Sequence, residues 1–235
     1  MLRLAVAAVI VASMTGPAVA PAGSCTLEEV VMTWGFKESF RSYISGAIAQ
    51  GEWTVEGEVG YDTPTFSFTG QNGYLMPDRS AGEAEFNGAL RFIGHGGILD
   101  TSLGNPRLVF ESDSTATLYL DVVGDTMEEV SVAQPQVPFA ALSWDDSTLD
   151  SDSGTWSVTQ ANVTLTEAGS DAFGTYPAGE ALDPLDFRIT TTPGCLLPET
   201  APWGIVGGVA GLAVLGGVAA LTIVRVRKSR GQGRQ

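Results

Sequence analysis

The chain has 235 residues, 44% of them hydrophobic, and carries 27 Asp and Glu against 12 Lys and Arg. One basic residue precedes residue 20 and five follow residue 224, so the segment between them holds six basic residues against all 27 acidic ones. A surface of this charge repels the phosphate backbone of nucleic acids, which are therefore not expected as partners. Solubility is the simplest explanation of the acidity.

Both ends of the chain are predicted to be targeting segments. Residues 1–20 combine Arg3, an apolar run and an end of small residues, which is typical of a secretory signal peptide. Residues 203–224 form an uncharged apolar run long enough to be a transmembrane helix. The basic tail at residues 225–235 predicts a cytoplasmic C-terminus. We therefore expect one extracellular domain at residues 25–195, exported and anchored in the cell envelope.

Residues 196–202 form the expected linker between this domain and the apolar run. They contain Leu197-Pro198-Glu199-Thr200-Ala201, which resembles a sortase sorting signal with alanine in place of the final glycine. The order of motif, apolar run and basic tail fits cell-wall sorting. A plain membrane anchor is the alternative.

Cys25 and Cys195 are the two cysteines of the chain, and they bracket the expected domain. In an exported chain an even pair predicts a disulfide, which here closes a loop of about 170 residues. The alternative is that Cys25, which follows Ala22-Gly23-Ser24, is the lipid-attachment residue of a lipoprotein.

The stretch from Trp34 to Ile44, WGFKESFRSYI, is predicted to form a helix. Its apolar side chains recur at helical spacing and make one stripe: Phe36, Phe40, Tyr43 and Ile44. Ser39 lies one turn before Tyr43, so the tyrosine ring projects over a small side chain. Spacing alone leaves Tyr43 as either a core residue or a ligand.

After this helix the hydrophobic period changes from 3.6 to 2, which indicates strands. The predicted strands are residues 53–61, 65–69, 86–92, 108–110, 116–122, 130–132, 156–158, 163–165 and 187–190. Short strands with polar turns between them favour a mainly β fold. We expect an antiparallel two-sheet sandwich or barrel-like domain with one or two short helices.

The chemistry available to the chain is limited by its single histidine, His95, which lies within Gly94-His95-Gly96-Gly97. There is no Gly-x-Ser-x-Gly motif for a hydrolase nucleophile, and one histidine cannot form a two-histidine zinc site. A tyrosine and a histidine together suit ferric iron, because a phenolate is a hard anionic ligand and tyrosine is an established axial ligand of haem. A histidine that faces the phenol oxygen supplies the hydrogen bond that orients such a ligand.

Three segments in order resemble the HtaA domain family of cell-envelope haem-uptake proteins. They are WGFKESFRSYI, FIGHGGILDTSLGNPRLVF at residues 92–110, and YPAGEALDPLDF at residues 176–187. The resemblance covers about residues 27–189, nearly the whole exported part. It implies a fold of two antiparallel sheets with few helices, in agreement with the strand pattern.

The resemblance also implies a role for individual residues. Tyr43 matches the family's axial ligand of ferric haem b, and His95 matches the residue that hydrogen-bonds to it. Ser39 and Tyr176 match residues of the haem pocket. Phe36 shares the stripe of Tyr43 and is expected in the core and at the pocket.

The function implied by the resemblance is that of a non-enzymatic surface protein. It would capture haem from host haem proteins or other envelope haem-binding proteins and relay it to a membrane haem permease. A second axial ligand has no evident candidate, so we expect five-coordinate ferric haem. A structural or adhesive envelope domain without a ligand is the alternative, and an envelope hydrolase is a third interpretation.

Overall fold

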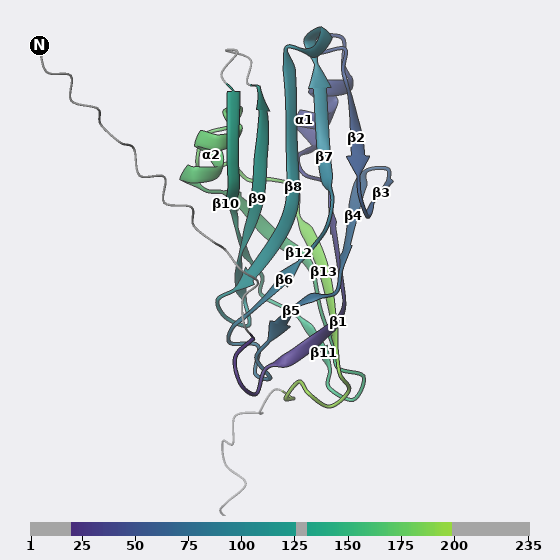
Figure 1. Ribbon diagram of the computed structural model, residues 1–235, viewed down its shortest axis with the longest axis vertical. Coiled ribbons are helices and arrows are strands. Elements are labelled where there is room, and N and C mark those ends of the chain that lie inside the picture. The colour runs from purple at the N-terminus through teal and green to yellow at the C-terminus, as the bar shows by residue number, and fades with distance from the viewer. Residues whose placement is uncertain (1–19, 126–130, 199–235) are drawn as a thin grey trace, which may run out of the picture. The chain divides into compact units, whose positions relative to one another are not determined.

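The computed structural model describes residues 20–125 and 131–198 (Figure 1). The predicted signal peptide (apart from its last residue), the apolar run and the basic tail lie outside these residues. Within the two described ranges, no helix combines the length and the apolar character that crossing a membrane requires.

The described residues form one antiparallel sheet of thirteen strands. In chain order the strands are β1 (Cys25–Trp34), β2 (Glu52–Glu56), β3 (Val59–Asp62), β4 (Thr65–Gly70), β5 (Asn72–Leu75), β6 (Gly82–Glu85), β7 (Ala89–Gly94), β8 (Leu99–Phe110), β9 (Thr115–Asp125), β10 (Ser131–Ser143), β11 (Thr148–Asp150), β12 (Thr155–Leu165) and β13 (Leu185–Thr191). The prediction of a mainly β antiparallel domain is confirmed.

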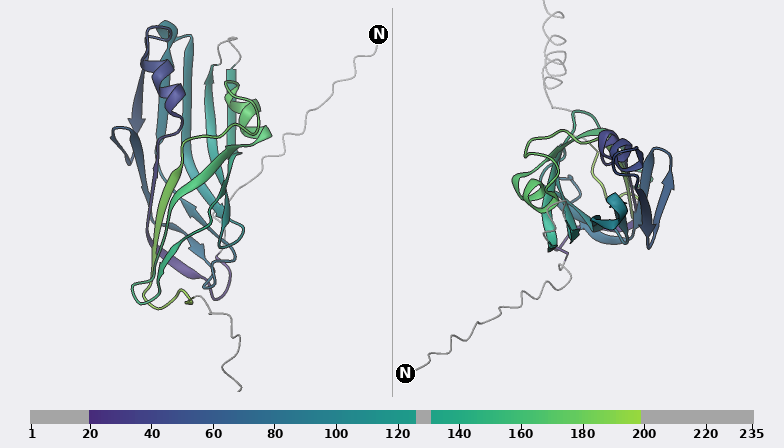
Figure 2. Two further views of the ribbon diagram at one scale, coloured as in Figure 1. Left: turned by 180° about the vertical axis from the view of Figure 1, so that it is seen from behind. Right: turned by 90° about the horizontal axis from the view of Figure 1, so that it is seen from above.

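Hydrogen-bonded neighbours close this sheet into a ring. It runs through β1, β13, β12, β10, β9, β8, β6 and β5 and returns to β1. The remaining strands extend it: β7 and β2 continue from β8, β4 and β3 from β1, and β11 from β12. The view from above in Figure 2 shows the strands around a common interior. The two expected sheets are therefore joined into one.

Two short helices and a 3-10 turn lie towards one end of this ring (Figure 1). The first helix, α1 (Glu38–Ser45), follows β1, and the second, α2 (Glu167–Phe173), lies between β12 and β13. The turn η1 (His95–Gly97) joins β7 to β8. We call this end of the domain the helical end.

Two groups of aromatic side chains occupy much of the core. The upper group, at the helical end, has ring centroids 5.1–6.3 Å apart and consists of Trp34, Phe36, Phe40, Phe92, Phe139 and Phe173. The lower group has centroids 5.2–5.9 Å apart and consists of Phe110, Trp144, Trp156 and Phe187. Each aromatic pair adds about 0.5–1.5 kcal/mol beyond the burial of its area. The upper group is the support on which α1 rests.

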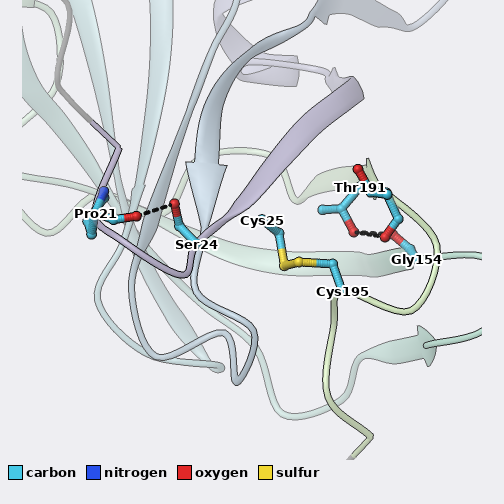
Figure 3. Close-up of a disulfide and its surroundings, with 7 residues drawn as sticks. Pro21, Ser24, Cys25, Gly154, Thr191 and Cys195 are labelled. Carbon is cyan, nitrogen blue, oxygen red and sulfur yellow. Dashed lines mark hydrogen bonds between the residues drawn. A yellow bond between two sulfur atoms is a disulfide. The ribbon is translucent and has the colours of Figure 1, made fainter.

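A disulfide joins Cys25, the first residue of β1, to Cys195, which lies beyond the end of β13 (Figure 3). The disulfide prediction is confirmed, and the sulfur of Cys25 is bonded to protein rather than to lipid. Beyond the disulfide, Leu196 is buried, and the N–H of Leu197 donates to the carbonyl of Pro77 at 2.8 Å. The folded body therefore includes the first residues of the expected linker.

The predicted helix at residues 34–44 is wrong at its start. Alternating burial along β1 continues through Met32 to Trp34, and α1 begins only at Glu38. Between strand and helix, Phe36 has a φ of 64°, a left-handed conformation outside the helical region. The chain therefore leaves the sheet and turns sharply before the helix begins.

The predicted strand at residues 53–61 is wrong in its continuity, because β2 and β3 are separated at Gly57. This glycine has a φ of 70°, and a Cβ atom there would lie 2.9 Å from the Cα atom of Gly88. Close approach of the two backbones requires glycine at this point.

The predicted strand at residues 86–92 begins only at Ala89. The predicted strands at residues 108–110 and 116–122 lie in β8 and β9, which pair as an antiparallel hairpin.

Candidate functional site

Tyr43 and His95 meet at the helical end of the domain. Tyr43 lies in α1 and His95 begins η1. The phenol oxygen lies 2.5 Å from Nε2 of the imidazole, so the expected hydrogen bond between the two residues is present. Both side chains are half-buried. The pair is thus supported by protein on one side and accessible on the other.

The backbone around His95 holds its ring against α1. His95 has a φ of 54°, and Gly96 and Gly97 follow with φ values of 67° and 99°. Left-handed conformations cost glycine little, which explains the glycines after the histidine. The N–H of His95 donates to the carbonyl of Ala49 at 2.7 Å, in the loop between α1 and β2. The loop that follows Tyr43 therefore also anchors its partner.

The apolar side of α1 fixes the helix on the upper aromatic group. Phe40 and Ile44 are at most 1% exposed. The ring of Phe40 meets those of Phe92 and Phe173 edge-on, with centroids 5.1 and 5.2 Å away. Tyr43 lies 6.2 Å from Phe40 at the outer border of this packing. The tyrosine ring is therefore supported by the core while its oxygen points to the imidazole.

Ser39 and Tyr176 form a second polar pair at the same end. Their hydroxyl oxygens lie 3.1 Å apart. The ring of Tyr176 stacks on Phe173 at 6.3 Å, and its carbonyl accepts a hydrogen bond from Ser170 of α2 at 2.7 Å. It also lies 6.4 Å from Phe40. Phe40 therefore contacts both tyrosines of the candidate site.

Phe36 lies deeper than the two polar pairs. It is fully buried, and its ring centroid lies 5.2–5.5 Å from those of Trp34, Phe40, Phe92 and Phe173. Its place is within the upper aromatic group, where it supports α1 from below.

Charged contacts at the start of α1 were missed by the sequence analysis. Nζ of Lys37 lies 2.6 Å from a carboxylate oxygen of Glu180, and Nη2 of Arg41 lies 3.2 Å from Oδ2 of Asp183. The other oxygen of Asp183 accepts the N–H of Glu38 at 2.9 Å. Both acids belong to the YPAGEALDPLDF segment, but no local pattern relates that segment to a helix 140 positions earlier.

An ion pair ties together the two strands that flank η1. Arg91 on β7 donates from Nε and Nη2 to the two carboxylate oxygens of Asp100 on β8, at 2.8 and 2.6 Å. These hydrogen bonds hold the pKa of Asp100 below its ordinary value of 3.8 and raise the pKa of Arg91. The pair joins β7 to β8 on either side of the turn that carries His95.

Two isoleucines are exposed on the loops that hold the Tyr43–His95 pair. Ile48, between α1 and β2, is 75% exposed, and Ile98, directly after η1, is 48% exposed.

The fold and the site together define an antiparallel β-domain with a closed sheet that carries a phenol–imidazole pair above an aromatic core. The sequence model of the HtaA family matches residues 29–188. The chain therefore belongs to the HtaA family, which confirms the resemblance. HtaA proteins are haem-binding transport proteins of the cell envelope and are not enzymes.

Solved structures of HtaA proteins from Corynebacterium glutamicum are similar to the chain. The C-terminal domain of HtaA is 33% identical, with a TM-score of 0.66 over 72% of this chain and 99% of that one. The N-terminal domain of HtaA is 31% identical, with a TM-score of 0.61 over 70% and 98%. The heme-binding protein HtaB, at 23% identity and a TM-score of 0.55 over 72% and 96%, shares the fold. No curated protein matches the chain.

Proposed function

We propose that the chain is a cell-surface protein that binds ferric haem b through the phenolate of Tyr43, with His95 as the partner of that ligand. The observation that carries this proposal is the 2.5 Å contact between the phenol oxygen and Nε2. A free phenol is protonated at neutral pH, so ligation depends on the metal and on a hydrogen-bonding neighbour. The imidazole is placed to be that neighbour.

The surroundings of the pair fit haem as a cargo. A phenolate is a hard anionic ligand suited to Fe(III), and haem is held in other proteins by an axial tyrosine. Ser39 and Tyr176 add two hydroxyl groups at the same end of the domain. Ile48 and Ile98 add exposed apolar surface, which a flat apolar macrocycle would cover.

Family membership supports a role in haem transport. The protein would receive haem from host haem proteins or from other envelope haem-binding proteins and pass it to a membrane haem permease. Transfer by exchange of the axial ligand needs no covalent step. The apolar run at residues 203–224 would anchor the extracellular domain in the envelope, and five-coordinate iron would leave one axial position open for the acceptor.

Release of haem is expected to depend on the oxidation state of the iron. A phenolate favours Fe(III) over Fe(II), so reduction of the iron by an external one-electron donor would weaken the bond that holds the cargo. Loss of the hydrogen bond from His95 is the other route. If reducing the bound haem leaves its rate of transfer to apomyoglobin unchanged, the reduction route is wrong.

Haemin titration of the purified full-length chain tests the proposal. The wild-type chain should bind haemin and show a tyrosinate-to-iron charge-transfer band, and Tyr43→Phe should abolish that band. Tyr74→Phe is the matched control, because Tyr74 lies on β5 beside the disulfide-linked start of β1. A wild-type chain that fails to bind haemin, or a Tyr43→Phe spectrum equal to that of Tyr74→Phe, would contradict the proposal.

A further inference from the structure

The helix that carries Tyr43 does not cap its own N-terminus. Lys37 occupies the N-cap position and makes no side-chain capping hydrogen bond. The first amides of a helix have no partner within the helix and are usually satisfied by a neighbouring Ser, Thr, Asp or Asn. Here the N–H of Glu38 donates to Oδ1 of Asp183 at 2.9 Å. A residue 145 positions later in the chain therefore supplies the cap.

Asp183 is bound to the region of α1 by all of its polar groups. Its Oδ2 lies 3.2 Å from Nη2 of Arg41, its N–H donates to the carbonyl of Phe36 at 2.9 Å, and its carbonyl accepts the indole N–H of Trp34 at 2.8 Å. Arg41 is 8% exposed. Its Nη1 also donates to the carbonyl of Gly35 at 2.7 Å and to the carbonyl of Pro64. A buried guanidinium of this kind needs a counter-charge.

Gly35 makes the space that this carboxylate occupies. A Cβ atom at position 35 would lie 2.5 Å from Oδ2 of Asp183 and 3.0 Å from Nη1 of Arg41. Because real Cβ atoms do not approach other atoms so closely, a larger residue would displace the ion pair. The position of the Asp183 carboxylate therefore depends on glycine at position 35.

The segment that contains Asp183 contacts α1 along its first turn and a half. Tyr176 meets Ser39, and Glu180 meets Lys37, which also donates to the carbonyl of Ala181 at 2.6 Å. With Glu38 and Arg41 bound by Asp183, four positions at the start of the helix are attached to residues 176–183. The attached positions lie within two turns of Tyr43 in the same helix.

We propose that Asp183 is a positioning residue for Tyr43: by capping α1 and neutralising Arg41, it sets the approach of the phenol to His95 and to the iron. The inference rests on the proposed haem function. A ligand must be held to within about 0.5 Å of its working geometry by groups that surround it. A carboxylate near the N-terminus of a helix also interacts favourably with the helix dipole.

The test compares three variants of the full-length chain loaded with haemin: Asp183→Ala, Asp183→Asn and Gly35→Ala. Asp183→Ala removes both the cap and the counter-charge, and haem should leave at least about tenfold faster, with a weakened charge-transfer band. Asp183→Asn keeps an oxygen that can accept the N–H of Glu38, so its effect should be intermediate. Gly35→Ala should act in the same direction, because it displaces the same carboxylate.

Glu83→Gln is the matched control, because it breaks an ion pair on another part of the sheet. Glu83, whose side chain is 10% exposed, lies 3.1 Å from Nη1 of Arg107. We expect Glu83→Gln to lower the melting temperature while leaving the charge-transfer band and the haem dissociation rate unchanged. If the Asp183 and Glu83 variants speed haem loss in proportion to their loss of melting temperature, the role of Asp183 is structural and the proposal is wrong.

The remaining outcomes separate this proposal from the proposed function. A wild-type chain that does not bind haemin refutes the haem function and the positioning role together. A wild-type chain that binds haemin, beside a folded Asp183→Ala variant with the same band and dissociation rate, refutes the positioning role alone. If circular dichroism shows that Asp183→Ala is unfolded, Asp183→Asn and Gly35→Ala decide, and wild-type dissociation rates in both would overturn the proposal.

Discussion

The phenol oxygen of Tyr43 lies 2.5 Å from Nε2 of His95, although 52 positions separate the two residues in the chain. Two supports bring them together. α1 rests on the upper aromatic group through Phe40, and η1 is bound to the loop after α1 through the carbonyl of Ala49. One support is the buried core and the other is the loop that follows α1, so both the ligand and its partner are fixed by contacts from elsewhere in the domain.

Replacing His95 with alanine should weaken the hold on haem without preventing ligation. The phenolate would lose its orienting hydrogen bond, and such losses in the surroundings of a metal ligand typically cost about 10–100-fold in affinity. Stopped-flow transfer of haem to apomyoglobin measures this directly. His95→Gln, which retains an amide able to hydrogen-bond, should lie between alanine and wild type. Equal transfer rates for His95→Ala and wild type would show that the histidine does not help to hold haem.

The hydroxyl groups of Ser39 and Tyr176 should act as one unit. A typical hydrogen bond contributes about 0.5–1.5 kcal/mol net, which corresponds to roughly a two- to tenfold change in haem affinity if the pair forms part of the pocket. Because Ser39→Ala and Tyr176→Phe each remove the same 3.1 Å contact, the double variant should lose little more than either single one. Strictly additive losses in a double-mutant cycle would show that the two hydroxyls act separately.

Much of the fold was predictable from the spacing at which apolar residues recur along the sequence. Period-2 patterns indicated most of the strands, and the hairpin of β8 and β9 follows from two apolar runs around a polar turn. The start of α1 was not predictable in this way, because Trp34 and Phe36 fit the apolar spacing of either a strand or a helix. The choice between them depends on the left-handed turn at Phe36 and on the contact of the Trp34 indole with the carbonyl of Asp183.

The candidate site was predictable only where a motif matched residue by residue. Tyr43, His95, Ser39 and Tyr176 were expected from the family resemblance, and the structure brings them together in two hydrogen-bonded pairs. The role of Asp183 has no local signal, since its partners lie about 145 positions earlier in the chain. Contacts of this kind are created by tertiary packing, and neither period nor spacing reveals them.

Removing the disulfide should destabilise the domain without changing the haem spectrum. The bond between Cys25 and Cys195 spans 170 positions, and loss of a native disulfide typically costs about 2–5 kcal/mol in the free energy of unfolding. It lies at the start of β1, whereas Tyr43 follows the other end of that strand. The double variant Cys25→Ser/Cys195→Ser should therefore unfold at lower urea concentration. A changed charge-transfer band in the folded double variant would contradict this separation.

The Asp100–Arg91 ion pair should make stability depend on pH at the acidic end. The hydrogen bonds from Arg91 lower the pKa of Asp100 in the folded state. The pair therefore stabilises the fold at pH values above 3.8, which is the ordinary pKa of the carboxyl group. This contribution is lost as the pH falls below that value and the carboxylate is protonated. Melting temperatures measured from about pH 5 to about pH 2 should fall less steeply for Asp100→Asn than for wild type. Parallel curves would mean that the pair contributes no pH-dependent stability.

The most direct test of the haem proposal is a crystal structure of the chain grown with haemin. We predict that the iron is bonded to the phenol oxygen of Tyr43 and that Nε2 of His95 remains within hydrogen-bonding distance of that oxygen. Iron bound by any other side chain, or a Tyr43 oxygen that makes no bond to the metal, would contradict it.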